Sequence, residues 1–247
     1  MRWRANSAED ACLFERPHHR DIALVLQSLD APVLSRRHCY FGGGTAMALL
    51  YGEYRESRDI DFVVSDLAGY RELRQMVGNA GGRLPFTREG LGVELARPVR
   101  ADQYGIRTQV RSGESAIKFE IVLEARIGLT LPEDDDRICG IQTLSRVDMA
   151  AEKLFANADR WADESVYSRD LIDLAMMRAD RRLLEAACEK AEGAYGASVR
   201  GSLYDAVSRL ETQRGRLEAC MTALSVDGVT RAQLWQAIRT VARQLLA

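Results

Sequence analysis

The sequence lacks the features of membrane proteins and of disulfide-bonded or zinc-binding proteins. No apolar run is long enough to span a bilayer, and the first residues, Met1 to Arg4, contain no apolar signal-peptide region. The five cysteines form no Cys-x-x-Cys pair, which predicts reduced thiols in a core rather than a disulfide framework or a zinc site. They are Cys12, Cys39, Cys139, Cys188 and Cys220. We therefore expect a cytoplasmic protein that does not associate with membranes.

Histidine and excess positive charge are also scarce. The three histidines have no metal-ligand spacing, and His18-His19, directly after Pro17, is predicted to lie in an exposed turn. The 34 Lys and Arg residues face 36 Asp and Glu residues, which gives a net charge of −2. This balance excludes a protein that coats nucleic acid without selectivity, so any basic surface must be local. With 247 residues, of which 47% are hydrophobic, the chain can form one large or two small globular domains.

Three consecutive glycines lie between a strand pattern and a helix pattern. Residues 38–41 can end a strand, Gly42, Gly43 and Gly44 follow, and Thr45 opens an apolar helix over 46–51. Glycine adopts positive φ readily and lets a ligand approach the backbone amides. A helix that begins directly behind such a turn points free N–H groups at an anion, usually a phosphate.

A pair of aspartates follows this helix in Ser57-Arg58-Asp59-Ile60-Asp61-Phe62. On a strand, Ser57, Asp59 and Asp61 would share one face, because alternate side chains point the same way. Two carboxylates at this spacing offer the hard oxygen ligands that suit Mg²⁺ or Mn²⁺. The alternative is a tight turn followed by a strand with a solvated acidic face. The order of glycine turn, helix and paired acids favours a site that holds a nucleoside triphosphate (NTP) against a metal.

Gly-Gly-Gly-Thr-Ala at 42–46 followed by Ser-x-Asp-Ile-Asp-Phe at 57–62 resembles the AbiEii/AbiGii-type toxin family. This family includes the MenT-type tRNA-modifying toxins and belongs to the nucleotidyltransferase superfamily with the polymerase-β-type core. The resemblance implies an α+β fold with a mixed-sheet nucleotidyltransferase core. It also implies that Gly43, Gly44, Thr45 and Ser57 bind the nucleotide. Asp59 and Asp61 are implied as catalytic metal ligands.

The strongest strand pattern is residues 116–124, which alternate so that Lys118 and Glu120 share a face. By the resemblance, Glu120 completes a metal-binding triad with Asp59 and Asp61, Glu124 is a second candidate for that role, and Lys118 contacts the nucleotide. The alternative is a simple Lys118–Glu120 pair on a wet edge. The acidic run at 133–136 is predicted to be a solvated loop, because consecutive acids repel and point in different directions.

From Ser145 onward nearly all the patterns are helical, with apolar residues three and four positions apart. These patterns cover 147–161, 170–178, 182–188, 199–210 and 231–246. We therefore expect a nucleotidyltransferase core at 1–145 and a C-terminal helical domain at 146–247. No tract rich in Gly, Ser or Pro marks a flexible linker between them.

A second motif lies at the start of this helical region. Lys153, Asn157 and Arg160 fall on one helix face, and Arg169 lies one turn before Asp173. Without a ligand, Lys153 would be an ordinary surface lysine whose loss changes stability by less than about 0.5 kcal/mol. The Arg169–Asp173 spacing would then be a helix salt bridge worth a few tenths of a kcal/mol.

Glu-Lys-Leu-x-Ala-x-x-x-Arg at 152–160 followed by Arg-Asp-x-x-Asp-Leu at 169–174 resembles the other signature of the same family. The resemblance implies that Lys153 contacts the triphosphate and that Asp170 or Asp173 completes the catalytic centre. Between the two acids the sequence does not decide. The resemblance spans about residues 38–175.

Together these motifs imply an enzyme that transfers a nucleoside monophosphate from NTP to an acceptor hydroxyl and releases pyrophosphate. By the resemblance, the acceptor is a tRNA 3′ end and the protein is the toxin of a pair with a separately encoded antitoxin. A small-molecule or protein acceptor, or a non-catalytic nucleotide-binding module, remains an alternative.

Overall fold

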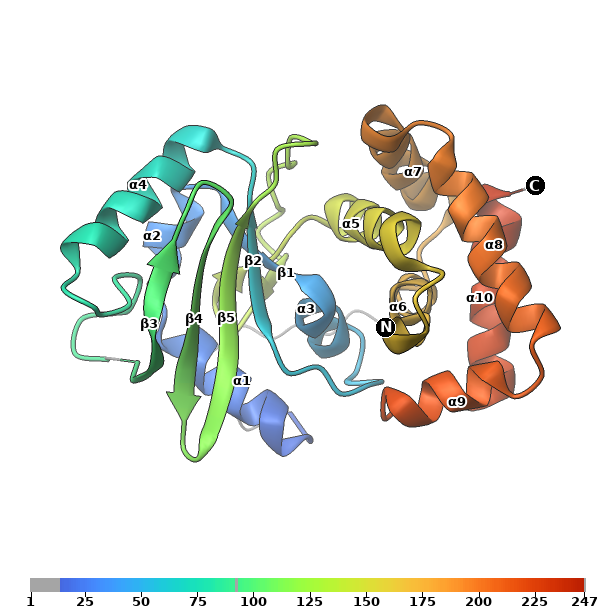
Figure 1. Cartoon of the computed structure of the whole chain (residues 1–247), viewed down its shortest axis with the longest axis horizontal. Helices are drawn as coiled ribbons and strands as arrows, with labels where there is room; N and C mark the ends of the chain where they lie inside the picture. Colours follow the sequence, from blue (N-terminus) through green and yellow to red (C-terminus); the bar gives the residue numbers. More distant parts are fainter. Residues whose placement is uncertain (1–13, 92, 247) are drawn as a thin grey trace. The chain divides into compact units, whose positions relative to one another are not determined.

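The computed structural model of the protein describes residues 14–91 and 93–246 (Figure 1). The chain forms two compact units. The first, called the sheet unit here, comprises the residues up to Leu50 together with Ser57–Ser145. The second, called the helical unit, comprises Arg146–Ala247 and also Tyr51–Glu56, which the sequence analysis placed in the first domain.

The sheet unit contains a five-stranded sheet in the order β1-β2-β5-β4-β3. Strands β2 and β5 are parallel and the other neighbouring pairs are antiparallel, so the sheet is mixed and the predicted α+β fold is confirmed. The elements are α1 (Pro17–Ser28), α2 (Ala31–Ser35), β1 (Cys39–Gly42), α3 (Gly43–Leu50), β2 (Ile60–Val64), α4 (Leu67–Asn79), β3 (Leu95–Ala101), β4 (Gly105–Ser112), β5 (Ser115–Leu123), β6 (Arg137–Ile138) and β7 (Ile141–Gln142).

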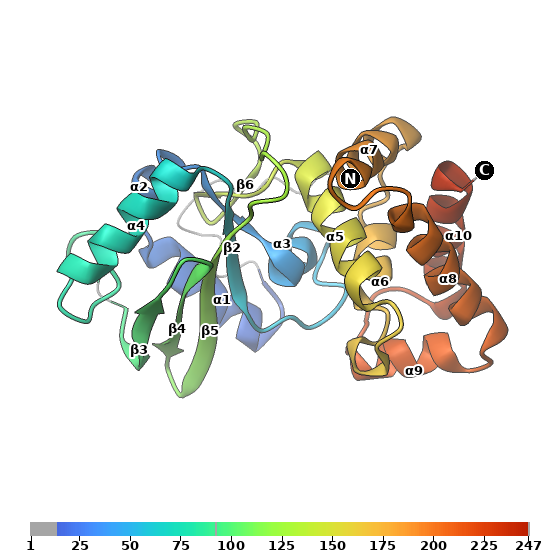
Figure 2. The same ribbon diagram turned by 45° about the horizontal axis from the view of Figure 1, so that its top comes forward.

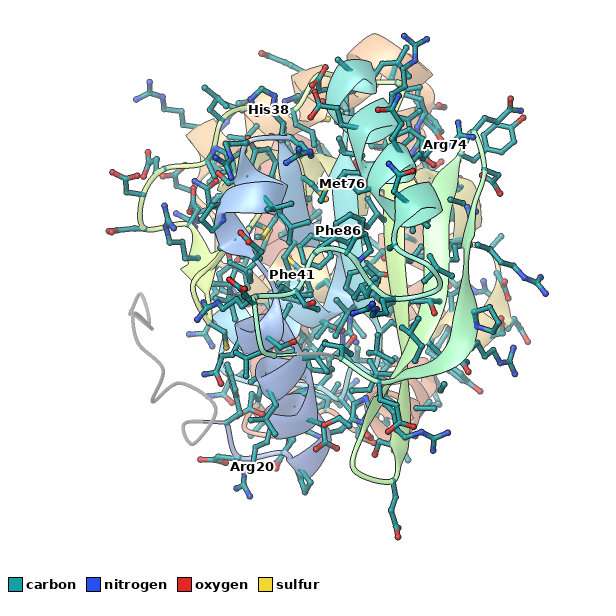
Figure 3. All side chains as sticks on the ribbon, turned by 90° about the vertical axis from the view of Figure 1, so that its left-hand side faces the viewer. Arg20, His38, Phe41, Arg74, Met76 and Phe86 are labelled. Carbon is teal, nitrogen blue, oxygen red and sulfur yellow. The ribbon has the colours of Figure 1, made fainter. Side chains whose placement is uncertain are left out.

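One face of this sheet is apolar and the other is polar. On the apolar face, the rings of Phe41, Phe62 and Phe119 form a ladder across β1, β2 and β5, with centroids 5.5 and 5.6 Å apart. Helices α1, α2 and α4 pack against the sheet. In Figure 3 the blue helices α1 and α2 lie to one side of the green strands β3 to β5, with Phe41 and Phe86 labelled. The alternation of side chains then sends Asp61 and Glu120, which are register partners, to the opposite face.

The helical unit is built around α5. Helix α5 packs against α6, α7 and α8, and α10 packs against α6 to α9 (Figure 2). The elements are α5 (Arg146–Arg160), a short 3-10 helix (Glu164–Val166), α6 (Arg169–Met176), α7 (Arg181–Tyr195), α8 (Ser198–Thr212), α9 (Arg216–Ala223) and α10 (Arg231–Leu245). Helix α10 begins with a capping box between Thr230 and Gln233.

Several local predictions differ from the structure. Strands β6 and β7 form a two-stranded hairpin, because Cys139 and Gly140 between them both have positive φ and turn the chain. Helix α9 was not anticipated; only Leu217 and Cys220 of its residues are buried, which makes a weak apolar pattern. The acidic run is not wholly solvated, since Asp136 is buried and accepts a bond from the backbone N–H of Glu133.

Four of the five cysteines lie within the described residues. Cys39, Cys139, Cys188 and Cys220 are free and buried, whereas Cys12 lies outside the described residues, as do Met1 to Arg4. Over 14–91 and 93–246, no helix is long and apolar enough to cross a membrane.

Candidate active site

The glycine turn joins β1 directly to α3. Gly43 has φ +69°, a value that favours glycine, and a Cβ on it would lie 2.7 Å from Asp61 Oδ2. A Cβ on Gly42 would lie 2.7 Å from Leu144 Cδ1. Thr45 is fully buried in the first turn of α3, and its hydroxyl donates to Ser57 Oγ over 2.8 Å. The turn therefore brings the start of a helix, with its free N–H groups, against the carboxylate of Asp61.

The two aspartates occupy different local structures. Strand β2 begins only at Ile60, so Asp61 is a strand residue whereas Ser57 and Asp59 precede the strand. The expectation that all three share a strand face is therefore wrong. The reason is the glycine turn: β1 pairs with β2 as far as Gly42 opposite Asp61, and at Gly43 the chain turns into α3 and leaves no strand to pair with earlier residues. Asp59 is exposed and Asp61 is half-buried.

The segment before Asp59 is held by the first turn of α1. The backbone N–H of Ser57 donates to Nε2 of His19 over 3.2 Å, and His18 Nε2 lies 3.0 Å from the carbonyl oxygen of Arg58. His19 is fully buried, so the prediction of an exposed turn at His18-His19 is wrong. Pro17 is the first residue of α1, where a missing N–H is harmless, and the histidines follow inside the helix.

Glu120 is engaged by two cations. Its Oε1 accepts from Arg107 Nε over 2.5 Å, and its Oε2 lies 2.5 Å from Lys118 Nζ. Partial burial raises the pKa of Glu120, but the bonds from Lys118 and Arg107 outweigh it, so its pKa is below the ordinary value. Glu124, the second candidate, is buried and paired with Arg126 over 2.5 Å.

Lys118 lies close to both aspartates as well as to Glu120. Burial lowers its pKa, but the bond to Glu120 and the charges of Glu120, Asp61 and Asp59 raise it above the ordinary value. Lys118 therefore stays protonated at neutral pH. Its side chain is 48% exposed, so the ammonium can also reach a ligand.

The acids of the sheet unit fit a divalent cation as a pair rather than as a triad. In the part of the chain that the structure describes, no three His, Cys, Asp or Glu side chains are arranged to hold a metal ion. The expected Asp59–Asp61–Glu120 triad is therefore not assembled, because Lys118 and Arg107 take the oxygens of Glu120. Mg²⁺ sites that act on nucleotides commonly use one or two carboxylates together with substrate phosphates. Asp59 and Asp61 would be the two carboxylates of such a site.

The second motif forms a buried ionic network within the helical unit. Lys153 Nζ on α5 lies 2.6 Å from Asp173 Oδ2 and 3.3 Å from Asp170 Oδ1. Arg160 donates to both oxygens of Asp170, over 2.7 and 2.9 Å. Lys153 is only 7% exposed in its side chain, so it is not a surface lysine. Asp173 pairs with Lys153 and Arg55 rather than with Arg169 as a plain helix salt bridge.

Asp173 anchors the excursion of the chain at Tyr51–Glu56. Its Oδ1 accepts from the Tyr54 hydroxyl and from Arg55 Nε, each over 2.6 Å, and its Oδ2 accepts from Arg55 over 2.8 Å. Burial raises the pKa of Asp173, but Arg55 and Lys153 outweigh it and hold that pKa well below the ordinary value. The same holds for Asp170. Burial raises its pKa, but Lys153 and Arg160 outweigh this effect, so the pKa of Asp170 lies below its ordinary value. Both carboxylates are charged at neutral pH.

The sequence profile that describes the AbiEii nucleotidyl transferase toxin of type IV toxin–antitoxin systems matches residues 25–240. The chain belongs to this family. It is therefore a nucleotidyl transferase, and the resemblance stated from its two motifs is confirmed. The AbiEii match runs beyond the motif region of about 38–175 and includes most of the C-terminal helices.

Two further comparisons complete the picture of this AbiEii protein. Solved structures similar to it include JHP933 from Helicobacter pylori, with 16% identity, a TM-score of 0.49 and coverage of 98% of this chain and 95% of the other. A candidate nucleotidyltransferase from H. pylori has 14% identity and a TM-score of 0.49, with 98% of each chain covered. A search of curated protein sequences finds no match.

Membership of the AbiEii family also defines partners in general terms. A nucleotidyl transferase uses an NTP, in general with a divalent metal, and a type IV toxin–antitoxin system includes an antitoxin. The residues expected at the site fall into two sets. Gly43, Thr45, Ser57, Asp59, Asp61, Lys118 and Glu120 lie in the sheet unit, whereas Lys153, Asp170 and Asp173 lie together in the helical unit.

Proposed function

We propose that this AbiEii-family enzyme transfers a nucleoside monophosphate from NTP to the 3′ end of tRNA, with Mg²⁺ or Mn²⁺ as its metal. The observation that carries the chemistry is the contact of the Asp61 carboxylate with the glycine turn at the start of α3. A phosphate-binding turn and a carboxylate that can hold a metal are thereby adjacent, as transfer from a triphosphate requires.

The residues of the sheet unit have separate roles in this proposal. The backbone N–H groups of Gly43, Gly44 and Thr45 bind the terminal phosphates. The Thr45 hydroxyl donates to Ser57, whose own hydroxyl can then donate to a phosphate. Asp59 and Asp61 would hold the divalent cation, which when bound neutralises phosphate charge and lowers the pKa of the attacking hydroxyl. The acceptor hydroxyl attacks the α-phosphorus in line and pyrophosphate leaves, and Lys118, which interacts with both aspartates, offsets negative charge at the α-phosphate.

The ionic network of the helical unit supports a role in anion binding. Its ion pairs form a chain in which Lys153 links Asp170 to Asp173, Arg160 pairs with Asp170 and Arg55 with Asp173, so three positive charges face two negative ones. A partly buried excess of positive charge is favourable near a triphosphate. We propose that Lys153, Asp170 and the half-exposed Arg160 face the nucleotide. Asp173, which is fully buried and bonded to three residues, positions Lys153 in that arrangement.

The biological role proposed is that of a toxin held in check by a separately encoded antitoxin. Extension of a tRNA 3′ end blocks aminoacylation and therefore growth. A small-molecule acceptor, a protein acceptor or a non-catalytic role predicts intact tRNA, so tRNA is the molecule to examine.

The decisive experiment incubates the purified protein with Mg²⁺, total tRNA and each labelled NTP in turn. We expect label at the tRNA 3′ end with the wild type and none with Asp61→Asn. The same pair is then induced in a bacterial host and the tRNA 3′ ends are sequenced. Growth arrest by both proteins, or unmodified tRNA in arrested cells, would contradict the proposal.

A further inference from the structure

A hollow of about 500 Å³ opens on the polar side of the sheet unit beside Asp59. It is lined by His18, Arg58, Asp59, Gln109, Ser115, Ala116 and Lys118. Six of these seven side chains are polar, and the charges of Arg58 and Lys118 exceed that of Asp59 by one. The volume lies in the range of small-ligand sites, about 300–1,000 Å³.

The hollow and the glycine turn lie on opposite flanks of β2. On one flank, β1 pairs with β2 at Gly42 opposite Asp61, and the turn continues into α3. On the other flank, β2 pairs with β5 and β5 with β4, where Lys118 and Gln109 are register partners. Asp61 lies against the glycine turn and Asp59 lines the hollow, so the two acids lie between the turn and the hollow.

The walls of the hollow are held in place by bonds within the sheet unit. The first turn of α1 fixes the wall that carries Arg58 and Asp59, because His18 and His19 bond the backbone of Arg58 and Ser57 in succession. Lys118 is fixed on the opposite wall by Glu120. A site whose walls are already ordered loses less conformational entropy when a ligand binds.

In-line transfer requires the attacking and leaving oxygens to lie on opposite sides of the α-phosphorus. If the triphosphate occupies the glycine turn, the attacking hydroxyl comes from the side of the hollow. We propose that the hollow binds the acceptor as the terminal nucleotide of an RNA 3′ end, with Arg58 and Lys118 at its phosphate and Gln109 at its base. This inference rests on the proposed function and adds the residues that select the acceptor.

The chemistry of the lining favours an anionic acceptor over a cationic one. Arg58 and Lys118 attract a phosphodiester, whereas they repel the ammonium groups of an amino sugar. The amide of Gln109 offers both a donor and an acceptor, which is the requirement for bonding a base edge.

The test compares transfer from labelled NTP to a synthetic RNA with a single-stranded 3′ end. The variants are Arg58→Gln and Gln109→Ala, and the control is Arg100→Gln, an exposed arginine of the same sheet that does not line the hollow. We expect Arg58→Gln to raise the KM for RNA about tenfold, to leave the KM for NTP unchanged and to reduce the salt slope of log KM by about one. Gln109→Ala should alter the preference for the terminal base, and Arg100→Gln should match the wild type.

The contrary outcomes separate this inference from the proposed function. A rise in the KM for NTP instead of RNA would assign the hollow to the nucleotide and overturn the inference. Wild-type KM values for RNA and unchanged base preference in both variants would also overturn the inference, but they would leave the proposed function intact. A wild type that binds NTP but extends neither this RNA nor total tRNA would contradict the proposed function itself, and the acceptor site with it.

Discussion

The carboxylate of Asp61 fills the space beside Gly43 in the glycine turn. Asp61 Oδ2 lies 2.7 Å from the position that a Cβ on Gly43 would occupy, and Gly43 has φ +69°. Any other residue at position 43 would therefore have to adopt a left-handed backbone and displace the carboxylate. The position of the Asp61 carboxylate therefore depends on glycine at position 43.

Gly43→Ala should reduce nucleotide transfer by about a hundredfold, because displacement of a reacting group by an ångström has that effect. The left-handed backbone should lower the free energy of unfolding by about 1–2 kcal/mol. Gly90→Ala is the matched control, since Gly90 has φ +80° and open space around its Cα. It should show the same loss of stability with wild-type transfer. Equal activities in the two variants would refute a specific role for the Gly43–Asp61 contact.

Removal of the charge of Lys153 or of Lys118 should have different effects on the free energy of unfolding. Lys153→Met leaves Asp170 and Asp173 buried with too few cations, so unfolding in urea should require about 3–5 kcal/mol less. Lys118→Met, at a half-exposed position, should change stability by less than about 1 kcal/mol while transfer falls. The large loss expected for Lys153→Met replaces the change of less than about 0.5 kcal/mol that the sequence alone predicted for an exposed Lys153. A Lys153→Met protein as stable as the wild type would show that the network is not formed in solution.

His19→Phe should keep the volume of a buried ring but remove the acceptor for the N–H of Ser57. We expect a loss of about 1–3 kcal/mol, the cost of an unsatisfied buried donor, and a lower kcat. His18→Phe, whose contact with Arg58 is exposed, should be close to wild type in stability. Calorimetry and steady-state kinetics measure the two effects. Unchanged kcat in His19→Phe would mean that the bond to Ser57 does not position Asp59.

The ionic network should make stability depend on pH only in acid. The pKa values of Asp170 and Asp173 are depressed in the folded protein, so their contribution is complete above the unfolded value of about 3.9 and is lost as pH falls toward the folded values. Below about pH 4, each group should lower the free energy of unfolding by about 1.4 kcal/mol per pH unit. Urea titrations from pH 7 to 2.5 would test this. The difference between wild type and Asp170→Asn should stay constant down to about pH 4 and then shrink; a difference that already shrinks near pH 6 would contradict it.

The sequence predicted those parts of the site that follow from neighbours along the chain. The glycine turn, the helix that follows it and the nearness of Asp61 to that turn all lie within about twenty residues of one another. The helix begins at Gly43, two residues before the predicted start at Thr45. Partners from distant segments were missed: His19 reaches Ser57 across 38 positions, and Arg55 reaches Asp173 across 118. Helical spacing correctly placed Lys153 and Arg160 on one face, but such a pattern does not tell whether that face is covered. Glu120 shows the same limit, because a strand pattern gives its direction and not the cations that bond it.

The assignment of Tyr51–Glu56 to the helical unit has a consequence for how the protein can be divided. The chain leaves the sheet unit after Leu50, supplies Tyr54 and Arg55 to Asp173, and re-enters it at Ser57. A fragment cut after Ser145 would keep Tyr54 and Arg55 but lose their carboxylate, and the complementary fragment would keep a buried carboxylate without its arginine. Neither fragment would therefore keep the buried Arg55–Asp173 pair, so we expect a cut at residue 145 to cost both fragments an interaction that the intact chain holds within one unit.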